Sequence, residues 1–378
     1  MRTCYVSPQK TGRMNHKNDP LWVICLGAGV SQLPLIKAAI DLGYKVLAVD
    51  RNRDSEGFSF ATEAMVLSIY DADRIIEELK LRSFVGLLCR CSGEALFTAA
   101  KVSNYFGFSG INYEFADIST SKSALREFCK TKHINMPDGI KSSIDDGVVI
   151  VSELASHVVV KPDFTLVGKQ SIKKVSADNK QLLAASIEAA SAASGNGLVE
   201  IEQFIDGYDC SFLFWIAGGG LTLLFDWDEL SIFDENGDLV SIGISSPSIA
   251  KSLGHLDKIM NIAKQVSANF SSVSAVVAFS FRIDSLGKCW LIEIHADFTG
   301  DLILDVLAPN ATGHNYLKGL TSLAINGSFD DENAKIILDQ ICTPTAVIYN
   351  ELPDYEIVKA HSISTLHRKI KELTKFRV

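Results

Sequence analysis

Residues 22–50 have the sequence WVICLGAGVSQLPLIKAAIDLGYKVLAVD, which contains a complete β-α-β unit. The apolar runs 22–26 and 45–49 predict two short strands, and the segment 32–42, closed by Gly43, predicts a helix between them. Strands this apolar are typical of a parallel sheet that is covered on both faces. The chain is therefore expected to begin its folded part with an α/β unit.

The same alternation continues beyond this unit, with a helix expected at 72–79, a strand at 84–89 and a helix at 93–106. We therefore expect a doubly wound, Rossmann-like α/β domain over residues 21–115. The polar segment 1–20 shows no periodicity and is expected to be a flexible arm.

The turn Gly27-Ala28-Gly29 after the first strand leaves two interpretations open. Asp50 would suit the ribose of NAD, as in a dehydrogenase, but Gln32 stands where a dinucleotide fingerprint has its third glycine. A structural or substrate-carrying turn is the favoured interpretation, because ligands gather at the carboxyl ends of parallel strands.

From about residue 116 the pattern changes to strands mixed with helices, which predicts an α+β domain over 116–330 and an extension over 331–378. The expected elements are helices at 121–132 and 181–193, strands at 157–161, 198–204, 210–217 and 221–226, a hairpin of 273–283 with 288–295, and, in the extension, a strand at 346–349 and a basic helix at 366–373.

Composition excludes several classes of protein. The 378 residues carry a formal net charge of −9, whereas nucleic-acid binders usually carry a basic stripe, so no nucleic-acid partner is expected. Eight cysteines in a chain of this length form neither a disulfide scaffold nor a zinc motif, which is typical of a cytoplasmic protein. The uncharged run 21–36 is too short for a membrane span and is interrupted by Pro34, so no membrane association is expected.

Four segments follow the first domain in a fixed order: Lys122; the strand 158–162 with a loop that holds Gly168 and Lys169; the segment 202–209; and the strand 291–295. Together with the α/β domain, they resemble the ATP-grasp superfamily of carboxylate–amine ligases over residues 21–325. The resemblance implies a pre-ATP-grasp α/β domain followed by an α+β ATP-grasp domain, with a lid subdomain at about 150–200.

The resemblance also implies how ATP would be bound. Lys122 and Lys161 would bracket the phosphate chain, and Lys161 ends an apolar strand, where an unpaired charge is costly. Gly168, Lys169 and Ser171 match the family's phosphate lid, in which backbone N–H groups also bind phosphate. The alternatives are solvent-exposed positions for the two lysines and an ordinary hairpin loop for the lid segment.

The segment Glu202-Gln203-Phe204-Ile205 resembles the part of the family that binds adenine. The Glu202 carboxylate would accept from the exocyclic amine, while backbone groups would face the ring edge. Asp209 matches the family's acceptor for the ribose hydroxyls. Glu200 alternates with Glu202 on one strand face, so either could be a solvated strand residue, and the family spacing selects Glu202.

The expected Mg²⁺ site departs from the family's pattern. Glu293 matches the carboxylate on the second hairpin strand, and His295 replaces the asparagine that usually follows it. The first strand, where relatives have an acidic residue, offers Ser280 or Phe281. Hard cations prefer oxygen ligands, which the Glu293 carboxylate offers. Glu293 and His295, the latter at the place of the family's asparagine, are the expected metal ligands.

Two further residues are candidates for contact with the reacting substrates. Asp297 stands where the family has an arginine that steadies the acyl phosphate. It could complete the metal site, hold a cationic amine substrate, or mark lost chemistry. Arg90 ends a strand of the first domain and could bind a substrate carboxylate through two hydrogen bonds, although a structural ion pair is an equally reasonable role.

The resemblance therefore predicts an ATP- and Mg²⁺-dependent ligase that forms an amide through an acyl phosphate, with Arg90, Glu293 and Asp297 as catalytic residues. Its substrates would be a small carboxylate and an amine, such as amino acids, and a homodimer is a reasonable assembly. The alternative is a nucleotide-binding protein with a degraded metal site and a regulatory or partner-subunit role.

Overall fold

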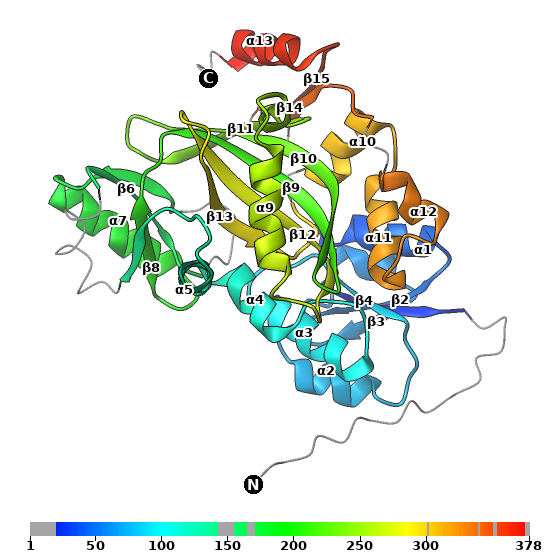
Figure 1. The fold of residues 1–378 in the computed structure, drawn as a ribbon. Helices are drawn as coiled ribbons and strands as arrows, with labels where there is room; N and C mark the ends of the chain where they lie inside the picture. Colours follow the sequence, from blue (N-terminus) through cyan, green and yellow to red (C-terminus); the bar gives the residue numbers. More distant parts are fainter. Residues whose placement is uncertain are drawn as a thin grey trace.

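The computed structural model describes residues 20–142, 155–164, 171–300, 302–338, 341–350 and 354–374. Figure 1 shows three sheets: a parallel sheet near the N-terminal part of the chain, a large antiparallel sheet at the centre, and a small sheet at the side of the molecule. Among the described residues, no helix has the length and apolar character needed to cross a bilayer, and the seven described cysteines are free thiols.

The predicted β-α-β unit is confirmed, and it belongs to a four-stranded parallel sheet in the order β3-β2-β1-β4. Apolar residues of both faces of β1 are buried, as expected for a sheet covered on both sides. The elements are β1 (Trp22–Leu26), α1 (Leu33–Asp41), β2 (Lys45–Asp50), β3 (Glu63–Val66), α2 (Ala72–Leu79), β4 (Gly86–Cys89) and α3 (Glu94–Phe106).

The central sheet has seven antiparallel strands in the order β13-β12-β9-β10-β11-β14-β15. Its strands are β9 (Gly207–Ala217), β10 (Gly220–Phe233), β11 (Leu239–Ser246), β12 (Ser274–Asp284), β13 (Cys289–His295), β14 (Thr345–Tyr349) and β15 (Tyr355–Lys359). The predicted hairpin is the pair β12–β13.

The strand expected at 221–226 is too short, because β10 runs on to Phe233 and pairs with the unpredicted β11. Asp226 and Asp228 look like the end of a strand in the sequence, but both are buried. The Ser248 hydroxyl and N–H groups of the following turn bind these carboxylates, which allows the strand to continue through them.

A small sheet in the order β5-β8-β6-β7 and helix α7 form a unit where the lid subdomain is predicted, and we call this unit the lid. Its elements are β5 (Gly139–Ser142), β6 (His157–Pro162), β7 (Lys173–Ser176), α7 (Lys180–Ala193) and β8 (Val199–Gln203). The lid has its own apolar core, in which Val158, Val160 and Ile201 pack against Leu183 and Ile187 of α7. Because this core is separate, the lid is a structural unit of its own beside the central sheet.

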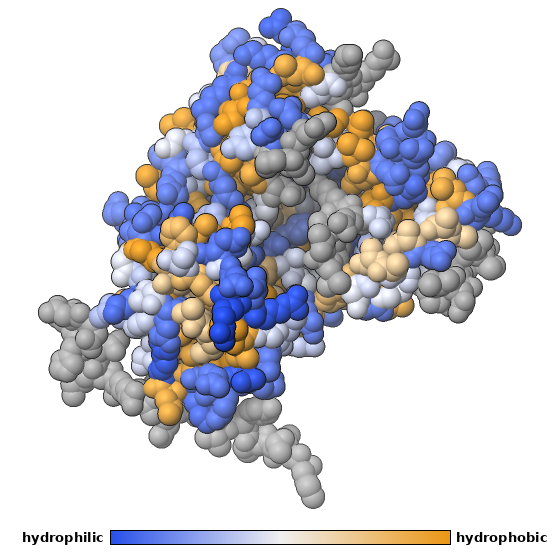
Figure 2. Space-filling model, turned by 180° about the vertical axis from the view of Figure 1, so that it is seen from behind, coloured by the Kyte–Doolittle hydropathy of each residue, from blue (hydrophilic) through white to orange (hydrophobic). Residues whose placement is uncertain are grey.

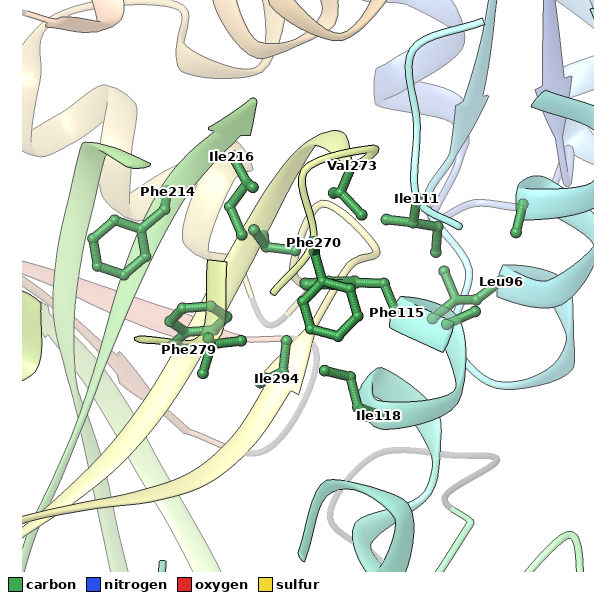
Figure 3. Close-up of a cluster of buried hydrophobic side chains, with 14 of the residues drawn as sticks. Leu96, Ile111, Phe115, Ile118, Phe214, Ile216, Phe270, Val273, Phe279 and Ile294 are labelled. Atoms are coloured by element: carbon green, nitrogen blue, oxygen red, sulfur yellow. The ribbon is translucent and has the colours of Figure 1, made fainter. Parts of the chain in front are cut away.

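The two faces of the central sheet have different surroundings. Phe212, Phe214 and Phe279 point to one face, where they share a core with α9 (Leu256–Ser267) and α4 (Tyr113–Thr120). Figure 3 shows Phe115 of α4 and Phe270 between this sheet and Leu96 of α3, so one core joins the parallel and antiparallel parts. Ser211 alternates with these phenylalanines and faces the opposite side, where a cleft lies.

The C-terminal part of the chain returns to both large sheets. Helix α11 (Tyr316–Asn326) packs against α1 and β4 of the parallel sheet, and β14 extends the antiparallel sheet beside β11. The strand and helix expected in the extension are therefore continuous with the rest of the fold. The remaining elements are α5 (Lys122–Lys132), α8 (Ile249–Ser252), the π-helix Ile303–Leu307, α10 (Ala308–Thr312), α12 (Glu332–Lys335), α13 (Ile363–Thr374) and the 3-10 helices Glu56–Ser59 and Ile336–Leu338.

Candidate functional site

A cleft of about 930 Å³ lies between the part of the central sheet that carries Ser211 and Ser280, the lid and the carboxyl end of β4. Figure 2 shows that the molecule is hollowed on this face, opposite to the view of Figure 1. Most of the side chains predicted from the sequence line the cleft: Arg90, Lys122, Lys161, Glu202, Gln203, Phe204, Ile205, Asp209, Glu293, His295 and Asp297.

The predicted phosphate lid is only partly covered by the structure. Gly168 and Lys169 lie outside the described residues. Ser171 is described, with a φ of 57°, but it is not among the described residues that line the cleft. The role of these three residues stays a prediction.

Lys122 is the first residue of α5 and is 7% exposed, so it is not the solvated helix residue that the sequence left open. The Ser121 hydroxyl caps the helix by accepting from the Ala124 N–H, which fixes where α5 begins. The Lys122 ammonium lies 3.4 Å from Oε1 of Glu293 on β13. A cation from the helix and an anion from the sheet thus meet at the wall of the cleft.

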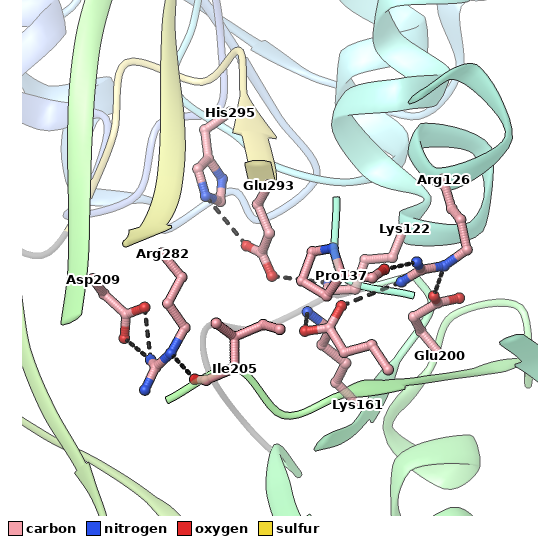
Figure 4. A network of polar contacts seen from close by, with 11 residues as sticks. Lys122, Arg126, Pro137, Lys161, Glu200, Ile205, Asp209, Arg282, Glu293 and His295 are labelled. Carbon is pink, nitrogen blue, oxygen red and sulfur yellow. Dashed lines mark hydrogen bonds and ion pairs between the residues drawn. The ribbon is translucent and has the colours of Figure 1, made fainter. Parts of the chain in front are cut away.

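Lys161 at the end of β6 is 3% exposed, and its ammonium lies 2.6 Å from Oε1 of Glu202 on the neighbouring strand β8. Glu202 is also 3.3 Å from the guanidinium of Arg126 on α5. Figure 4 shows that Arg126 continues this network to Glu200 and to the Pro137 carbonyl. The network ties the helix of Lys122 to the lid strands of Lys161.

Glu200 is fully buried beneath this network, and burial raises its pKa to about 7 although Arg126 counteracts the effect. Its Oε2 atom has no hydrogen-bond partner among the described residues. Sequence reasoning treated Glu200 as a solvated alternative to Glu202 and missed Arg126 altogether. A Cβ atom at Gly139 would lie 2.5 Å from the Arg126 guanidinium, a constraint that only the structure reveals.

Asp163 makes a second link between the lid and α5, and it was not predicted. The carboxylate of this fully buried residue accepts from the Ser123 N–H at 2.7 Å and from the Asn196 amide at 2.6 Å. Its carbonyl accepts from the Lys122 N–H at 3.1 Å. The residue two positions after Lys161 therefore holds the amino end of the helix that carries Lys122.

Asp209, the predicted ribose acceptor, faces Arg282 on the neighbouring strand β12. The Arg282 guanidinium lies 2.8 and 2.7 Å from the two carboxylate oxygens of Asp209, and it also donates to the Ile205 carbonyl. Two cations lie near the ring of Phe204: Lys174, 3.7 Å from its centroid, and Arg282, at 5.3 Å. Arg282 was not predicted, although it alternates with Ser280 on the same strand face.

The strand register decides between the two candidates for the first-strand position of the metal site. Ser280 is directly opposite Glu293, whereas Phe281 is opposite Leu291 and packs in the apolar core. The Ser280 hydroxyl lies 2.9 Å from that of Ser211 on β9. Ser280, a neutral residue, therefore occupies the position across from the Glu293 carboxylate.

Glu293 and His295 project from alternate positions of β13, with His295 Nε2 3.3 Å from Glu293 Oε2. Burial alone would raise the pKa of Glu293, but Lys122 and His295 hold it well below its usual value. For His295, burial would lower the pKa, but the hydrogen bond and charge of Glu293 raise it. The described part of the chain contains no group of three carboxylate, imidazole or thiolate side chains that could hold a metal ion by itself.

Mg²⁺ is commonly held by one or two carboxylates together with substrate phosphates, and it keeps several waters. Glu293 supplies one such carboxylate at the cleft wall. The residues present therefore fit an ion that is held mainly by a bound phosphate chain.

Arg90 is paired within the protein. Its guanidinium donates to both carboxylate oxygens of Asp305, at 3.1 and 2.6 Å, and to the carbonyls of Thr299 and Ser31. The structural ion pair considered from the sequence is thus present, although Asp305 could not be identified there. Arg90 also lines the cleft, and its contact with a substrate carboxylate stays a prediction.

Asp297 lies on the loop after β13 and lines the same end of the cleft as Arg90. Its Oδ1 atom is buried and has no hydrogen-bond partner among the described residues.

The alternative use of the first domain for NAD finds little support in the local geometry. Oδ2 of Asp50 accepts from the Ala28 N–H at 2.9 Å, so this carboxylate is occupied in closing the turn. The Gln32 side chain packs over the turn, 3.0 Å from where a Cβ of Gly27 would be, and donates to the Arg90 carbonyl. This side chain stands at the position of the third glycine, which in a dinucleotide fingerprint allows the helix and the strand to pack closely.

No protein-family model matches the chain, and no curated protein matches it by sequence. Solved structures that resemble it are those of ATP-grasp ligases, and the chain has their fold. The L-amino acid ligase from Bacillus licheniformis is 15% identical with a TM-score of 0.69, over 94% of this chain and 97% of that one.

Two further structures give the same result. Phosphoribosylglycinamide synthetase from Anaerococcus prevotii is 16% identical with a TM-score of 0.67, over 94% of this chain and 98% of that one. N5-carboxyaminoimidazole synthetase from Staphylococcus aureus, complexed with ADP, is 14% identical with a TM-score of 0.67, over 90% and 85%. The likeness covers almost the whole length of these chains, so the predicted overall fold of the ATP-grasp ligases is confirmed, while the predicted division into two domains stays a prediction.

Proposed function

We propose that this chain is an ATP-dependent ligase that joins a small carboxylate to an amine, through an acyl phosphate, with release of ADP and phosphate. The observation that carries the proposal is the convergence of Lys122 and Lys161, two buried cations from separate elements, on one cleft. A buried cation is costly unless it is paired, and each lysine has one glutamate at its ammonium group, Glu293 or Glu202.

In this proposal the phosphate chain of ATP lies between the two lysines. Phosphoryl transfer requires positioning and charge neutralisation more than covalent chemistry by the protein. Phosphate oxygens that enter the cleft would share the ammonium groups with Glu293 and Glu202. The networks through Arg126 and Asp163 keep the two lysines in place relative to one another, because they join α5 to β8 and to the end of β6.

The adenine would lie along Glu202-Gln203-Phe204-Ile205, at the junction of the lid and the central sheet. The Ile205 N–H has no hydrogen-bond partner among the described residues, so it is available to a ring nitrogen. The N–H groups of Gln203 and Phe204 are used by the carbonyls of Asp138 and His157, which hold the segment in place. Asp209 would accept from the ribose hydroxyls while Arg282 fixes its orientation.

Mg²⁺ would be held by Glu293 with the imidazole of His295 beside it, and when bound it would neutralise part of the phosphate charge. The Lys122 ammonium group contacts the same Glu293 carboxylate, so the protein itself supplies a second positive charge beside the proposed metal position. The carboxylate and the amine would bind at the end of the cleft lined by Arg90 and Asp297, where residues 21–115 meet residues 116–330.

Thermal melting with ATP, ADP and NAD, each with and without Mg²⁺, tests the proposal, because a ligand that binds only the native state raises the melting temperature. We expect a shift with ATP that grows with Mg²⁺ and none with NAD. Lys161→Met should remove the ATP shift, and Lys141→Met, a change at an exposed lysine of the lid, should keep it. No shift with ATP, or an equal shift in both variants, would contradict the proposed nucleotide site.

A further inference from the structure

We propose that the end of the cleft beside the turn after β1 is an apolar subsite, which binds an uncharged hydrocarbon group of one substrate and not a phosphate group. Its walls are Val30, Pro34, Leu302 and Ile303. This inference rests on the proposed ligase function and names a property of one of the two substrates. It is carried by exposed apolar side chains, by the backbone at Leu302, and by charges that are already paired.

The first wall of the subsite is the turn after β1 together with the start of α1. Val30 is 67% exposed, Pro34 is partly exposed in the first turn of α1, and both line the cleft. Single exposed apolar residues are common on protein surfaces. Here two of them border one end of a cleft, where a bound hydrocarbon group would remove their apolar area from water, and that burial is favourable.

The second wall, Leu302 and Ile303, comes from a distant part of the chain and lies beside the first wall. Arg90 joins the two walls, because its guanidinium donates to the Ser31 carbonyl at 3.3 Å and to the carboxylate of Asp305 at 3.1 and 2.6 Å. Helix α1 and the π-helix also share one apolar core. Apolar side chains from two separate segments therefore border the same end of the cleft.

The backbone at Leu302 is unusual. This residue has a φ of 64°, in the left-handed region that leucine rarely adopts and that glycine would occupy without strain. The π-helix begins directly after it, and the Leu307 N–H donates to the Leu302 carbonyl, five residues earlier. This backbone turns Asp305 toward Arg90 while Ile303 stays buried. Because π-helical turns and strained non-glycine residues are concentrated at functional sites, a leucine kept here indicates that its side chain is used.

The charges around the subsite favour an uncharged group over a phosphate. Among the described residues, each lysine or arginine that lines the cleft has a carboxylate partner: Arg90 with Asp305, Lys122 with Glu293, Lys161 with Glu202, and Arg282 with Asp209. Asp297 lines the same end of the cleft as Arg90 and interacts electrostatically with His295. Glu94 places a carboxylate in the first turn of α3, whose amino end would otherwise attract an anion. A phosphate in the subsite would therefore lose hydration without gaining an unpaired cation among the described residues.

The test measures the Kd of two series of probes by ligand-observed NMR titration of the protein with Mg²⁺ and the non-hydrolysable ATP analogue AMP-PNP. The series are the straight-chain carboxylates from acetate to hexanoate and the primary amines from ethylamine to hexylamine. We expect the Kd of one series to fall about fourfold for each added CH₂, since each buried CH₂ strengthens binding by that factor. 3-Phosphonopropionate and 3-aminopropylphosphonate, which end in a charged group, should bind at least about 10-fold more weakly than pentanoate and pentylamine.

Val30→Asp places a charge in the subsite without disturbing the core, so it should abolish the gain in affinity per CH₂. Leu302→Gly removes one wall side chain at a φ that suits glycine, so it should reduce this gain. Val66→Asp, a change at an exposed valine of the edge strand β3 outside the cleft, is the matched control and should leave both series unchanged. A retained melting shift with ATP and Mg²⁺ shows that each variant is folded.

Several results would overturn the inference while leaving the ligase proposal in place. They are Kd values that do not change with chain length in either series, an equal gain per CH₂ in Val30→Asp and the wild type, tighter binding of a phosphonate than of its hydrocarbon counterpart, and no measurable binding of any probe although ATP with Mg²⁺ stabilises the protein. Failure of ATP to stabilise the wild type would instead contradict the ligase proposal itself, and the same titrations without nucleotide would then test the subsite alone.

Discussion

Removing the Arg126 side chain by Arg126→Met tests the network that joins α5 to the lid. Arg126 is 9% exposed and contacts Glu200, Glu202 and the Pro137 carbonyl. Breaking a buried pair by removing one partner costs about 3–5 kcal/mol, because a buried charge is left unmatched. Glu202 keeps Lys161 as a partner at 2.6 Å, so the cost falls mainly on Glu200.

The expected cost depends on pH, because the pKa of Glu200 is raised to about 7 from the ordinary 4.5. A carboxyl whose pKa is higher in the folded state binds a proton more tightly there, so its burial destabilises the fold increasingly as the pH rises from about 4.5 to about 7. The difference between these two pKa values corresponds to about 3 kcal/mol of unfolding free energy in the wild type. Loss of the Arg126 charge raises the pKa of Glu200 further, so the unfolding free energy of the variant should rise more than that of the wild type when the pH is lowered.

We therefore expect Arg126→Met to lose about 3–5 kcal/mol of unfolding free energy at pH 8 and about 1–2 kcal/mol at pH 5, where only hydrogen bonds are missing. Urea unfolding followed by circular dichroism at the two pH values measures both losses. The matched control is Arg82→Met, which breaks a surface pair with Glu63 and should cost under about 1 kcal/mol at either pH.

A loss at pH 8 below about 1 kcal/mol, or equal losses at pH 5 and pH 8, would refute this reasoning. The double variant Arg126→Met, Glu200→Leu gives a second check. Replacing a whole buried ion pair by apolar side chains is often neutral, so this variant should recover most of the stability at pH 8.

Three more predictions concern the site and its supports. Glu293→Gln should lower ADP release by about 100-fold or more, since it removes the metal-binding carboxylate. It should also make the ATP-induced melting shift independent of Mg²⁺. A shift that still grows with Mg²⁺ would exclude Glu293 as a metal ligand. Asp163→Ala should cost about 2 kcal/mol in urea unfolding and raise the KM for ATP, because the amino end of α5 loses its carboxylate; an unchanged KM would separate this contact from nucleotide binding. Burial raises the pKa of Asp228 to about 7, so the wild type should lose stability as the pH rises from about 4 to about 7, and Asp228→Asn should show a smaller loss in melts at pH 5 and pH 8; equal losses would contradict the buried carboxyl.

The order of elements in the first domain could be predicted because its signals are local. The apolar runs of β1 and β2, the turn between them and the helix α1 each lie within about ten neighbouring residues, where hydrophobic periodicity decides the structure. The hairpin of β12 and β13 could also be predicted, from its turn residues. The continuation of β10 past Asp226 could not be predicted, because the buried carboxylates of this strand accept hydrogen bonds from a turn some 20 residues further along the chain.

The partners of the charged residues in the cleft could not be predicted. Arg126 and Glu200 are 74 residues apart, Arg282 and Asp209 are 73 apart, and Arg90 and Asp305 are 215 apart. No local pattern connects such residues, because an ion pair depends on where two separate elements come to lie.

The amino-acid sequence by itself determined the types of elements, their order and the reactive side chains at their ends. Side-chain chemistry and hydrophobic periodicity are properties of short segments, and they are readable without a fold. The tertiary structure alone decided that Lys122 and Lys161 face one cleft, and that Ser280 rather than Phe281 lies opposite Glu293. It also decided that Arg90 pairs with Asp305, and that Oδ1 of Asp297 has no hydrogen-bond partner among the described residues. The physical reason is that charge pairing and burial depend on distances in space, and packing of the lid and the two larger sheets sets those distances.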